Sequence, residues 1–306
     1  MRYIIGIDLG GTNLKVALFD HRLKVKDMQV LSTRVFKTKE GLIKIIIDSI
    51  KDIIRRNKLS TREILGVGLG LPGPVDAKKG IVHFFPNIPG WNEVPLKKIL
   101  NNRLSLPIFI DNDVNLMALA EYRAGAAKNS RNAVCLTLGT GIGAGIIIEG
   151  RLYRGSSYAA GEIGHIPINE KGPACNCGGS ACIESYVGNL RIINLASKIF
   201  KRKIGLEELS GLAGKRNRLA LKIWRAVGEK LGIALAGVTN LLNPDCIVIG
   251  GGVANAGRIL FDSIRDTIKQ RAMTTPAQHV KILKAKLGNS AGLIGAALLV
   301  KERGEL

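Results

Sequence analysis

The sequence predicts an α/β protein of two lobes with a cleft between them. Its 306 residues exceed one average domain and fit two. Segments typical of strands alternate with segments of helical periodicity, and one pattern, a strand, a glycine turn and a second strand, occurs at both 3–20 and 133–153. Because each hairpin would open one lobe, we expect an N-terminal lobe over 1–115 and a C-terminal lobe over 116–289. A last helix at 290–303 is expected to pack back on the first lobe.

Within the first lobe, the residues after the hairpin predict alternating helices and strands. Short apolar runs at 64–71 and 107–110 predict strands, and the stretch 113–127 predicts a helix. A further helix is indicated by a candidate N-cap, Thr38, and by apolar residues that follow it at helical spacing: Leu42, Ile45, Ile46, Ile50, Ile53 and Ile54. The alternation favours a mostly buried sheet with helices packed on it.

The second lobe has a different order of elements after its hairpin. A cysteine-rich loop comes first, and the stretch 184–242 is predicted to be mostly helical. The apolar run 246–249 predicts a buried strand, which ends in the turn Gly250-Gly251-Gly252 before another helix.

The chain is strongly basic, with a formal net charge of +21, which raises nucleic acid as a partner. Between 191 and 230, however, the Lys and Arg residues are interspersed along predicted helices, so we expect a solvated basic face and no nucleic acid partner. Apolar runs such as 145–148 fall far short of the ~20 residues that cross a bilayer. The start of the chain lacks the regions of a signal peptide. We therefore expect a cytoplasmic protein without a membrane partner.

Two glycine-rich turns are candidates for phosphate binding. In Asp8-Leu9-Gly10-Gly11-Thr12, glycines let backbone N–H groups approach a phosphate, and the Asp8 carboxylate can serve Mg²⁺. A β-branched strand, not a helix, follows Gly139-Thr140-Gly141, which excludes a dinucleotide fingerprint. No Walker-type loop is present, which excludes a P-loop kinase. Either turn alone could be an ordinary hairpin turn. As a pair, one in each lobe, they can hold a polyphosphate from two sides.

A polar cluster, Asp111-Asn112-Asp113, lies between the predicted strand 107–110 and the predicted helix that follows. Asn112 or Asp113 could serve only as the N-cap of that helix. Two carboxylates that flank an amide also supply a proton acceptor beside hydrogen-bonding groups for a polyol, and phosphoryl transfer to a hydroxyl requires little more.

Four potential metal ligands gather in the glycine-rich loop: His165, Cys175, Cys177 and Cys182. One imidazole and three thiols match a closed tetrahedral zinc site, which would be structural. A disulfide with one spare thiol is the competing explanation. The remaining cysteines, Cys135 and Cys246, lie in apolar runs and are expected to be buried free thiols.

Taken in order, these segments resemble the ROK family, which comprises sugar kinases and related repressors with an actin-like, ribonuclease-H-like ATPase fold. The resemblance covers nearly the whole chain, and its most specific part is GEIGH followed by CxCGxxxCxE. It is carried by GIDLGGTNLKVALFD (6–20), GLGLPGPVD (68–76), FPNIPGW (85–91), IDNDVN (110–115), LTLGTGIGAGI (136–146), AGEIGHIPI (160–168), CNCGGSACIESY (175–186) and IVIGGGVA (247–254). ATP, Mg²⁺ and a structural Zn²⁺ are the ligands that the resemblance implies.

Carried over position by position, the resemblance implies Asp113 as the catalytic base. The hexose would contact Gly73, Asn87, Asn112, Glu162, His165 and Glu184. Phosphates and Mg²⁺ would contact Asp8, Gly10, Gly11, Thr12, Gly139, Thr140 and Gly141, and the adenosine would contact Gly250, Gly251 and Gly252. His165 would serve zinc through one ring nitrogen and the sugar through the other. The chain departs from the family pattern at Asn13, where many members have Lys, and at Ala181, where Gly is usual.

Three functions compete. The first is an ATP-dependent hexose kinase that forms glucose 6-phosphate, with N-acetylmannosamine, N-acetylglucosamine or fructose as alternative substrates, and with the use of other phosphate donors left open. The second is a sugar-sensing repressor of the same family, which would carry a helix-turn-helix before Asp8. The third, a zinc-dependent interaction module, leaves Asp113 and both glycine turns without a role. We favour the kinase and expect a homo-oligomer, either a dimer or a tetramer.

Overall fold

The computed structural model describes residues 2–33, 38–85, 88, 90–139 and 141–304. The chain divides into two compact units. Unit 1 consists of Met1–Ala120, Arg154–Ala160 and Asn289–Leu306, and unit 2 of Glu121–Tyr153 and Gly161–Gly288. The short segment Arg154–Ala160 therefore belongs to unit 1 although the residues on both sides of it belong to unit 2. No sequence pattern predicts that this segment belongs to unit 1.

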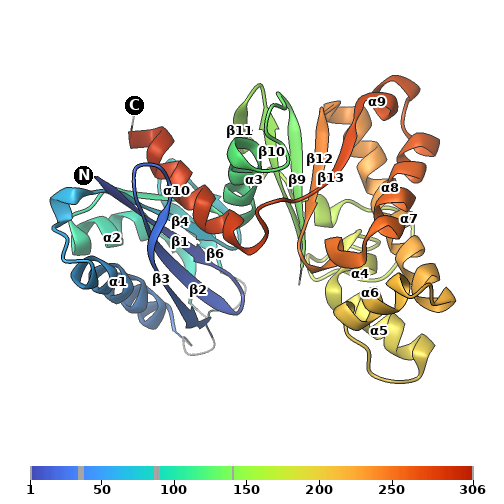
Figure 1. The fold of residues 1–306 in the computed structure, drawn as a ribbon, viewed down its shortest axis with the longest axis horizontal. Coiled ribbons are helices and arrows are strands. Elements are labelled where there is room, and N and C mark those ends of the chain that lie inside the picture. Colours follow the sequence, from blue (N-terminus) through green and yellow to red (C-terminus); the bar gives the residue numbers. More distant parts are fainter. Residues whose placement is uncertain (1, 34–37, 86–87, 89, 140, 305–306) are drawn as a thin grey trace. The chain divides into compact units, whose positions relative to one another are not determined.

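Unit 1 contains a five-stranded mixed sheet (Figure 1). Its strands, in spatial order, are β3 (Val25–Ser32), β2 (Asn13–Phe19), β1 (Tyr3–Leu9), β4 (Ile64–Leu71) and β8 (Ile108–Asn112). The β1–β2 and β2–β3 pairs are antiparallel, whereas β1, β4 and β8 run parallel. In this register Asp8 is paired with Gly70, and Gly70 with Asp111. The parallel strands therefore bring the first glycine turn and the Asp111-Asn112-Asp113 cluster to one edge of the sheet, two strand spacings or about 10 Å apart.

Helices cover both faces of this sheet. Helices α1 (Lys39–Arg56) and α2 (Leu96–Leu104) enclose the larger core, and α10 (Ala291–Gly304) packs on the opposite face, on β1 and β4 (Figure 1). The predicted cap of α1 is confirmed, because the Thr38 hydroxyl accepts a hydrogen bond from the Gly41 N–H at 3.1 Å. A smaller antiparallel sheet is formed by β5 (Val75–Asp76), β6 (Ile81–Phe84) and β7 (Asn92–Val94), and a 3-10 turn, η2 (Thr61–Glu63), precedes β4.

Glycines allow α10 to lie close to the sheet. A Cβ at Gly68 would lie 2.0 Å from the Ala296 carbonyl oxygen, and a Cβ at Gly6 would lie 2.8 Å from that of Leu293. Such distances leave no room for a side chain, so these glycines are required by close packing of backbone on backbone.

Unit 2 repeats the strand arrangement of unit 1. Its sheet, in spatial order, contains β11 (Arg151–Tyr153), β10 (Ile142–Ile148), β9 (Ala133–Leu138), β12 (Cys246–Gly250) and β13 (Lys281–Lys284). The β9–β10 and β10–β11 pairs are antiparallel, and β9, β12 and β13 run parallel. The predicted pair of hairpins is thus confirmed as β1–β2 and β9–β10, each at the same place in its sheet.

The region predicted as a mostly helical stretch over 184–242 contains four helices. They are α4 (Glu184–Val187), α5 (Asn189–Phe200), α6 (Leu206–Gly214) and α7 (Arg218–Leu242). The strand β12 is followed by η4 (Gly252–Ala256), α8 (Arg258–Arg271) and α9 (Thr274–His279). Helix α7 packs tightly on α8, since Cβ atoms at Gly228 and Gly232 would lie 2.6 Å from Ser263 Cβ and 2.4 Å from Thr267 Cβ.

Helix α3 (Asp113–Ala124) begins in unit 1 and ends in unit 2. Glu121 is the first residue of unit 2 and is fully buried. Its carboxylate accepts hydrogen bonds from the N–H groups of Ala126 at 2.7 Å and Leu287 at 2.8 Å. Leu287 lies just before the chain returns to unit 1 through η5 (Gly288–Ser290). Within unit 2, the Glu121 carboxylate therefore joins the segment that follows Ala120 to the segment that precedes Asn289.

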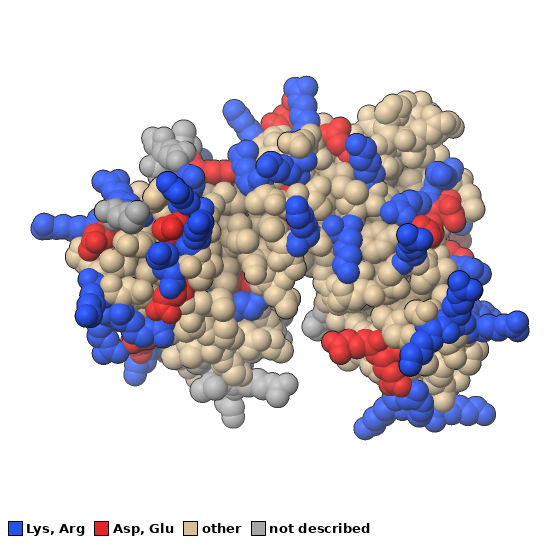
Figure 2. Space-filling model, viewed as in Figure 1, with Lys and Arg blue, Asp and Glu red and all other residues tan. Residues whose placement is uncertain are grey.

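The positive charge is spread over the surface rather than concentrated in one groove on the face shown in Figure 2. Between 191 and 230, all the Lys and Arg side chains except Lys230 are exposed. Among the helices of the described ranges, none is both long and apolar enough to cross a bilayer.

Candidate active site

The candidate base, Asp113, is the first residue of α3 and follows β8 directly. The Asn112 side-chain oxygen accepts hydrogen bonds from the N–H groups of Val114 at 2.9 Å and Asn115 at 3.2 Å, so Asn112 is the N-cap. The Val114 N–H also lies 2.9 Å from Asp113 Oδ1. Because Asn112 provides the cap, the half-buried Asp113 carboxylate is not needed for that purpose.

One other residue predicted to contact the sugar, Gly73, can be placed relative to Asn112. The Asn112 side-chain amide donates a hydrogen bond to the carbonyl oxygen of Gly73 at 3.0 Å, across 39 residues of sequence. Gly73 has a φ of +87°, which a residue with a side chain rarely adopts. The structure thus joins Gly73 and Asn112. The predicted contact at Asn87 lies outside the described residues.

Asp111 is held by a side chain that the sequence analysis did not identify. Arg154 Nε and Nη2 donate hydrogen bonds to Asp111 Oδ2 at 2.8 and 2.6 Å. The other carboxylate oxygen of Asp111 accepts from the Asn112 N–H at 2.9 Å and from the Asn115 amide at 3.0 Å. No motif or spacing pointed to Arg154, because it lies 43 residues from its partner.

The first glycine turn joins β1 to β2. Asp8 is mostly buried, and burial raises the pKa of its carboxyl although Lys15, with Nζ 3.6 Å from Oδ2, acts in the opposite direction. Gly10 and Gly11 do not have positive φ, and a Cβ at Gly11 would meet nothing within 4 Å. The local fold therefore does not require glycine at position 11. The backbone at Gly11 is exposed, as the predicted phosphate contact would require.

The second glycine turn, Gly139-Thr140-Gly141, lies next to Glu184, one of the residues predicted to contact the sugar. Glu184, the first residue of α4, accepts a hydrogen bond from the Ile142 N–H at 2.7 Å through Oε2. A Cβ at Gly141 would lie 2.7 Å from the same oxygen. Gly139 lacks a positive φ, and the nearest atom to a Cβ there would be the Gly141 carbonyl oxygen at 4.0 Å. Thr140 lies outside the described residues. Within unit 2, Glu184 thus lies directly beside the candidate phosphate loop.

The two glycines of the GEIGH segment have a packing role. A Cβ at Gly161 would lie 1.8 Å from the Ala144 carbonyl oxygen, and a Cβ at Gly164 would lie 2.4 Å from that of Ile142. Both glycines therefore press the segment against the backbone of β10. Glu162 immediately precedes the short turn η3 (Ile163–His165), which ends at His165, and His165 Nε2 lies 3.9 Å from Glu162 Oε2.

The four candidate metal ligands form one cluster. The ligand atoms of His165, Cys175, Cys177 and Cys182 all lie within 4.8 Å of one another. His165 Nδ1 lies 3.6 Å from Cys175 Sγ, and the sulfurs of Cys177 and Cys182 are 3.7 Å apart. Tetrahedral zinc, with Zn–S about 2.3 Å and Zn–N about 2.0 Å, requires N···S and S···S edges of about 3.5 and 3.8 Å. The cluster fits zinc, and 3.7 Å is far too long for a disulfide bond.

The thiols of this cluster differ in their electrostatic surroundings. Hydrogen bonding, led by the backbone N–H of Cys177, lowers the pKa of Cys175 to about 6. Burial, reinforced by the neighbouring thiols, raises the pKa of Cys182 to about 12. Cys135 and Cys246, which were expected to be buried free thiols, are both buried and free.

The predicted adenosine contacts end strand β12. Gly250 closes the strand, and Gly251 has a φ of +85° with its Cα pressed on the Leu138 backbone, so a Cβ there would lie 2.2 Å from the Leu138 carbonyl oxygen. Gly252 is open, with Leu206 Cδ1 at 3.8 Å from the position of a Cβ. The turn therefore leaves backbone accessible at Gly252, while Gly251 is required by the fold.

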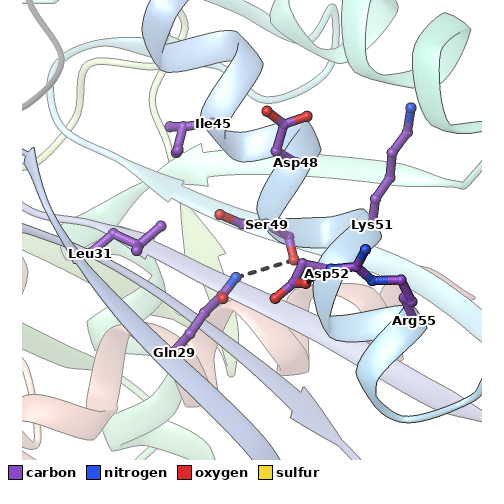
Figure 3. Close-up of a pocket in the computed structure, with 8 residues that line it drawn as sticks. All are labelled: Gln29, Leu31, Ile45, Asp48, Ser49, Lys51, Asp52 and Arg55. Atoms are coloured by element: carbon purple, nitrogen blue, oxygen red, sulfur yellow. Dashed lines mark hydrogen bonds and ion pairs between the residues drawn. The ribbon is translucent and has the colours of Figure 1, made fainter.

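A hollow of about 460 Å³ between β3 and α1 contains none of these residues (Figure 3). Its walls carry Gln29 and Leu31 from the strand and Asp48, Asp52 and Arg55 from the helix, and the Gln29 amide donates to the Ser49 carbonyl oxygen at 3.1 Å. The hollow mixes apolar groups with charges of both signs.

The model of the ROK family matches residues 4–303. The chain belongs to the ROK family. It is 33% identical to a glucokinase of Thermotoga maritima, over 98% of both chains. The structure of a ROK family glucokinase from Streptomyces griseus, in complex with glucose and AMPPNP, superimposes with a TM-score of 0.81 at 31% identity and covers 98% of this chain and 99% of that one.

Membership of the ROK family confirms the predicted actin-like ATPase fold, in which both units carry the same mixed sheet. The family also contains relatives of another kind. A xylose repressor of Caldicellulosiruptor bescii is 30% identical over 97% of this chain, which corresponds to 77% of that protein. Family membership alone therefore does not separate a kinase from a regulator.

Proposed function

We propose that this ROK family member is an ATP-dependent hexose kinase that phosphorylates glucose at its 6-hydroxyl. The observation that carries the proposal is the position of Asp113. Its carboxylate is half-buried at the N-terminus of α3, and Asn112 supplies the cap of that helix. A carboxylate in this position can accept the proton of a hydroxyl. The similarity to glucokinases over nearly full length supports glucose as the substrate and ATP as the donor.

In the proposed reaction, Asp113 removes the proton from the sugar hydroxyl as the oxygen attacks the γ-phosphorus. The P–O bond to the leaving ADP breaks, and the products are the hexose phosphate and ADP. Gly73, Asn112, Glu162, His165 and Glu184 would hold the sugar hydroxyls. Asn87 is proposed for the same role.

Exposed backbone at the two glycine turns would take up the negative charge of the phosphates. Asp8, Gly10, Gly11 and Thr12 would do so from unit 1, Gly139, Thr140 and Gly141 from unit 2, and Gly250 to Gly252 would contact the adenosine. Mg²⁺, which Asp8 would hold directly or through water, supplies charge neutralisation between the phosphates when bound.

Zinc would have a structural role. The Cys₃His cluster presents four ligands, which leaves no open position for substrate chemistry. His165 faces Cys175 through Nδ1, so its Nε2 remains available as a donor to a sugar hydroxyl or to Glu162. The metal would thereby fix the ring orientation of a residue that contacts the substrate.

A coupled assay of ADP release across a panel of glucose, N-acetylmannosamine, N-acetylglucosamine and fructose tests the proposal. We expect glucose to give the highest kcat/KM. If no hexose supports ADP release while glucose or xylose still binds in calorimetry, the protein is a sugar-sensing regulator, the function that the xylose repressor relatives favour. Polyphosphate in place of ATP in the same assay tests the choice of donor.

A further inference from the structure

The segment Arg154–Ala160 lies in unit 1, and its first side chain forms a buried ion pair there. Arg154 donates to Asp111 Oδ2 through Nε at 2.8 Å and through Nη2 at 2.6 Å. Its side chain is 19% exposed, and that of Asp111 is 0% exposed. A guanidinium that donates two hydrogen bonds to a carboxylate fixes the orientation of that carboxylate as well as neutralising its charge.

The second oxygen of Asp111 controls the start of α3. It accepts from the Asn112 N–H at 2.9 Å and from the Asn115 side-chain amide at 3.0 Å. Asn112 in turn caps α3 through Val114 and Asn115. Every one of these contacts lies within three residues of Asp113. The ion pair therefore determines where the backbone that carries the candidate base is held.

The same segment leads directly to candidate sugar contacts. The Ala160 N–H donates to the Arg154 carbonyl oxygen at 3.1 Å, which closes the segment into a loop. Gly161 and Glu162 follow at once. Arg154 is thus at one end of a loop whose other end, Ala160, is two residues before Glu162 in the chain.

We propose that Arg154 is a positioning residue for phosphoryl transfer, acting through Asp111 on Asp113. This inference rests on the proposed kinase function. A small displacement of a base from its acceptor geometry costs up to about 10²-fold in rate, so a residue that holds the base is expected to affect kcat more than ATP binding.

The test compares Arg154→Lys, Arg154→Met and the double variant Arg154→Met/Asp111→Asn with the wild-type chain. The control is Arg56→Met, at the last residue of α1, which removes two other ion pairs of unit 1: with Asp27 Oδ2 at 3.0 Å and with Asp52 Oδ2 at 3.4 Å. For each purified protein we would measure the melting temperature, hexose binding by calorimetry, kcat, and KM for hexose and for ATP.

We expect kcat to fall about 10²-fold in Arg154→Met and about 10-fold in Arg154→Lys, with KM for ATP within about twofold of wild type, since lysine keeps the charge but not the fork. The double variant leaves no unpaired buried carboxylate, because Asp111 is replaced as well. Its kcat should be no lower than that of Arg154→Met, because the two substitutions remove the two members of the same ion pair. Arg56→Met should keep wild-type kcat.

A folded Arg154→Met or double variant with wild-type kcat would overturn the inference, as would an equal loss in Arg56→Met. If Arg154→Met does not fold, the lysine and double variants decide in the same way. Wild-type protein without kinase activity would overturn the proposed function together with this inference. An active wild-type protein with unaffected Arg154 variants would overturn this inference alone.

Discussion

At the scale of single residues, Asp113 is the side chain on which the proposed chemistry depends most. Replacing it by Asn keeps the shape and removes the proton acceptor. We expect Asp113→Asn to bind hexose nearly as wild type while kcat falls by roughly 10²–10⁴. Calorimetry with glucose and the ADP-release assay measure the two quantities. Asp262→Asn, at an exposed position of α8, is the control that should leave both unchanged. A near-normal kcat in Asp113→Asn would remove Asp113 from its role.

Asp8 illustrates a conflict between stability and function. Its folded-state pKa is raised, mainly by burial, so the ionised form that would serve Mg²⁺ costs stability at pH values above its ordinary pKa of 3.8. Asp8→Asn removes that cost. We expect a melting temperature at or above that of wild type at pH 7, together with a loss in kcat of about 10²-fold.

The pH dependence of the stability difference between Asp8→Asn and wild type provides a check. Below pH 3.8 the carboxyl is protonated in folded and unfolded chains alike, so the advantage of Asp8→Asn should shrink as the pH is lowered toward that value. Melting curves at several pH values measure this difference. A variant that is less stable than wild type at pH 7 and active would contradict both parts.

At the scale of elements, the cysteine-rich loop has little regular structure to hold it. Its geometry matches tetrahedral zinc, so the metal is expected to stabilise the loop and with it His165. We expect about one zinc per chain by metal analysis, and a lower melting temperature after removal by a chelator. Cys177→Ser should lower the zinc content strongly. Cys135→Ala, which alters a buried thiol in β9, should keep it.

Zinc-free protein purified without chelator would count against this assignment. A disulfide between two cysteines of the cluster under reducing conditions would do the same, because the thiol pairs could not then serve a metal.

The contact between α10 and its sheet gives a second prediction at this scale. Gly68→Ala would place a methyl group 2.0 Å from the Ala296 carbonyl oxygen, so α10 must move. We expect a loss of about 1–3 kcal/mol in the free energy of unfolding, measured with urea. Gly237→Ala, at an exposed position inside α7 with nothing within 4 Å, is the matched control and should stabilise by up to about 1 kcal/mol. Equal stability of the two variants would show that α10 is not packed as described.

At the scale of the whole molecule, the candidate residues are divided between two units. Asp113 belongs to unit 1, and Glu162, His165 and Glu184 belong to unit 2. If all of them hold one sugar, hexose binding should favour a closed arrangement that also excludes water from the γ-phosphate.

Saturating glucose is therefore expected to compact the protein and to raise ATP affinity by a coupling of about 1–3 kcal/mol. Small-angle scattering with and without glucose measures compaction, and ATP titrations under both conditions measure the coupling. Galactitol, an open-chain polyol, serves as the solute control. Identical scattering curves with unchanged ATP affinity would mean that closure is not part of the mechanism, even if the chain is a kinase.

Much of the fold could be predicted from the sequence because its signals are local. The two hairpins, the Thr38 cap of α1 and the strand expected over 107–110 follow from apolar periodicity and turn residues within a few positions of one another. That strand is β8, which extends over Ile108–Asn112. The grouping of His165 with Cys175, Cys177 and Cys182 could also be predicted, since the ligand types are unusual and lie close in sequence. The division of the stretch 184–242 into four helices was not predicted, although the start of α7 has a local signal, since the Asn217 side chain caps it by accepting from the N–H groups of Leu219 and Ala220.

The sequence by itself determined the α/β class, the repeated hairpin and the chemical types of the candidate site residues, because these depend on local patterns and on the resemblance those patterns carry. Only the tertiary structure decided that Arg154 pairs with Asp111, that Glu121 joins two segments of unit 2, and that Asn112 rather than Asp113 caps α3. The Arg154 and Glu121 contacts join residues that are far apart in the chain, and the roles of Asn112 and Asp113 differ only in side-chain geometry. No periodicity or spacing encodes such contacts, because they exist only once the sheet and its helices have packed.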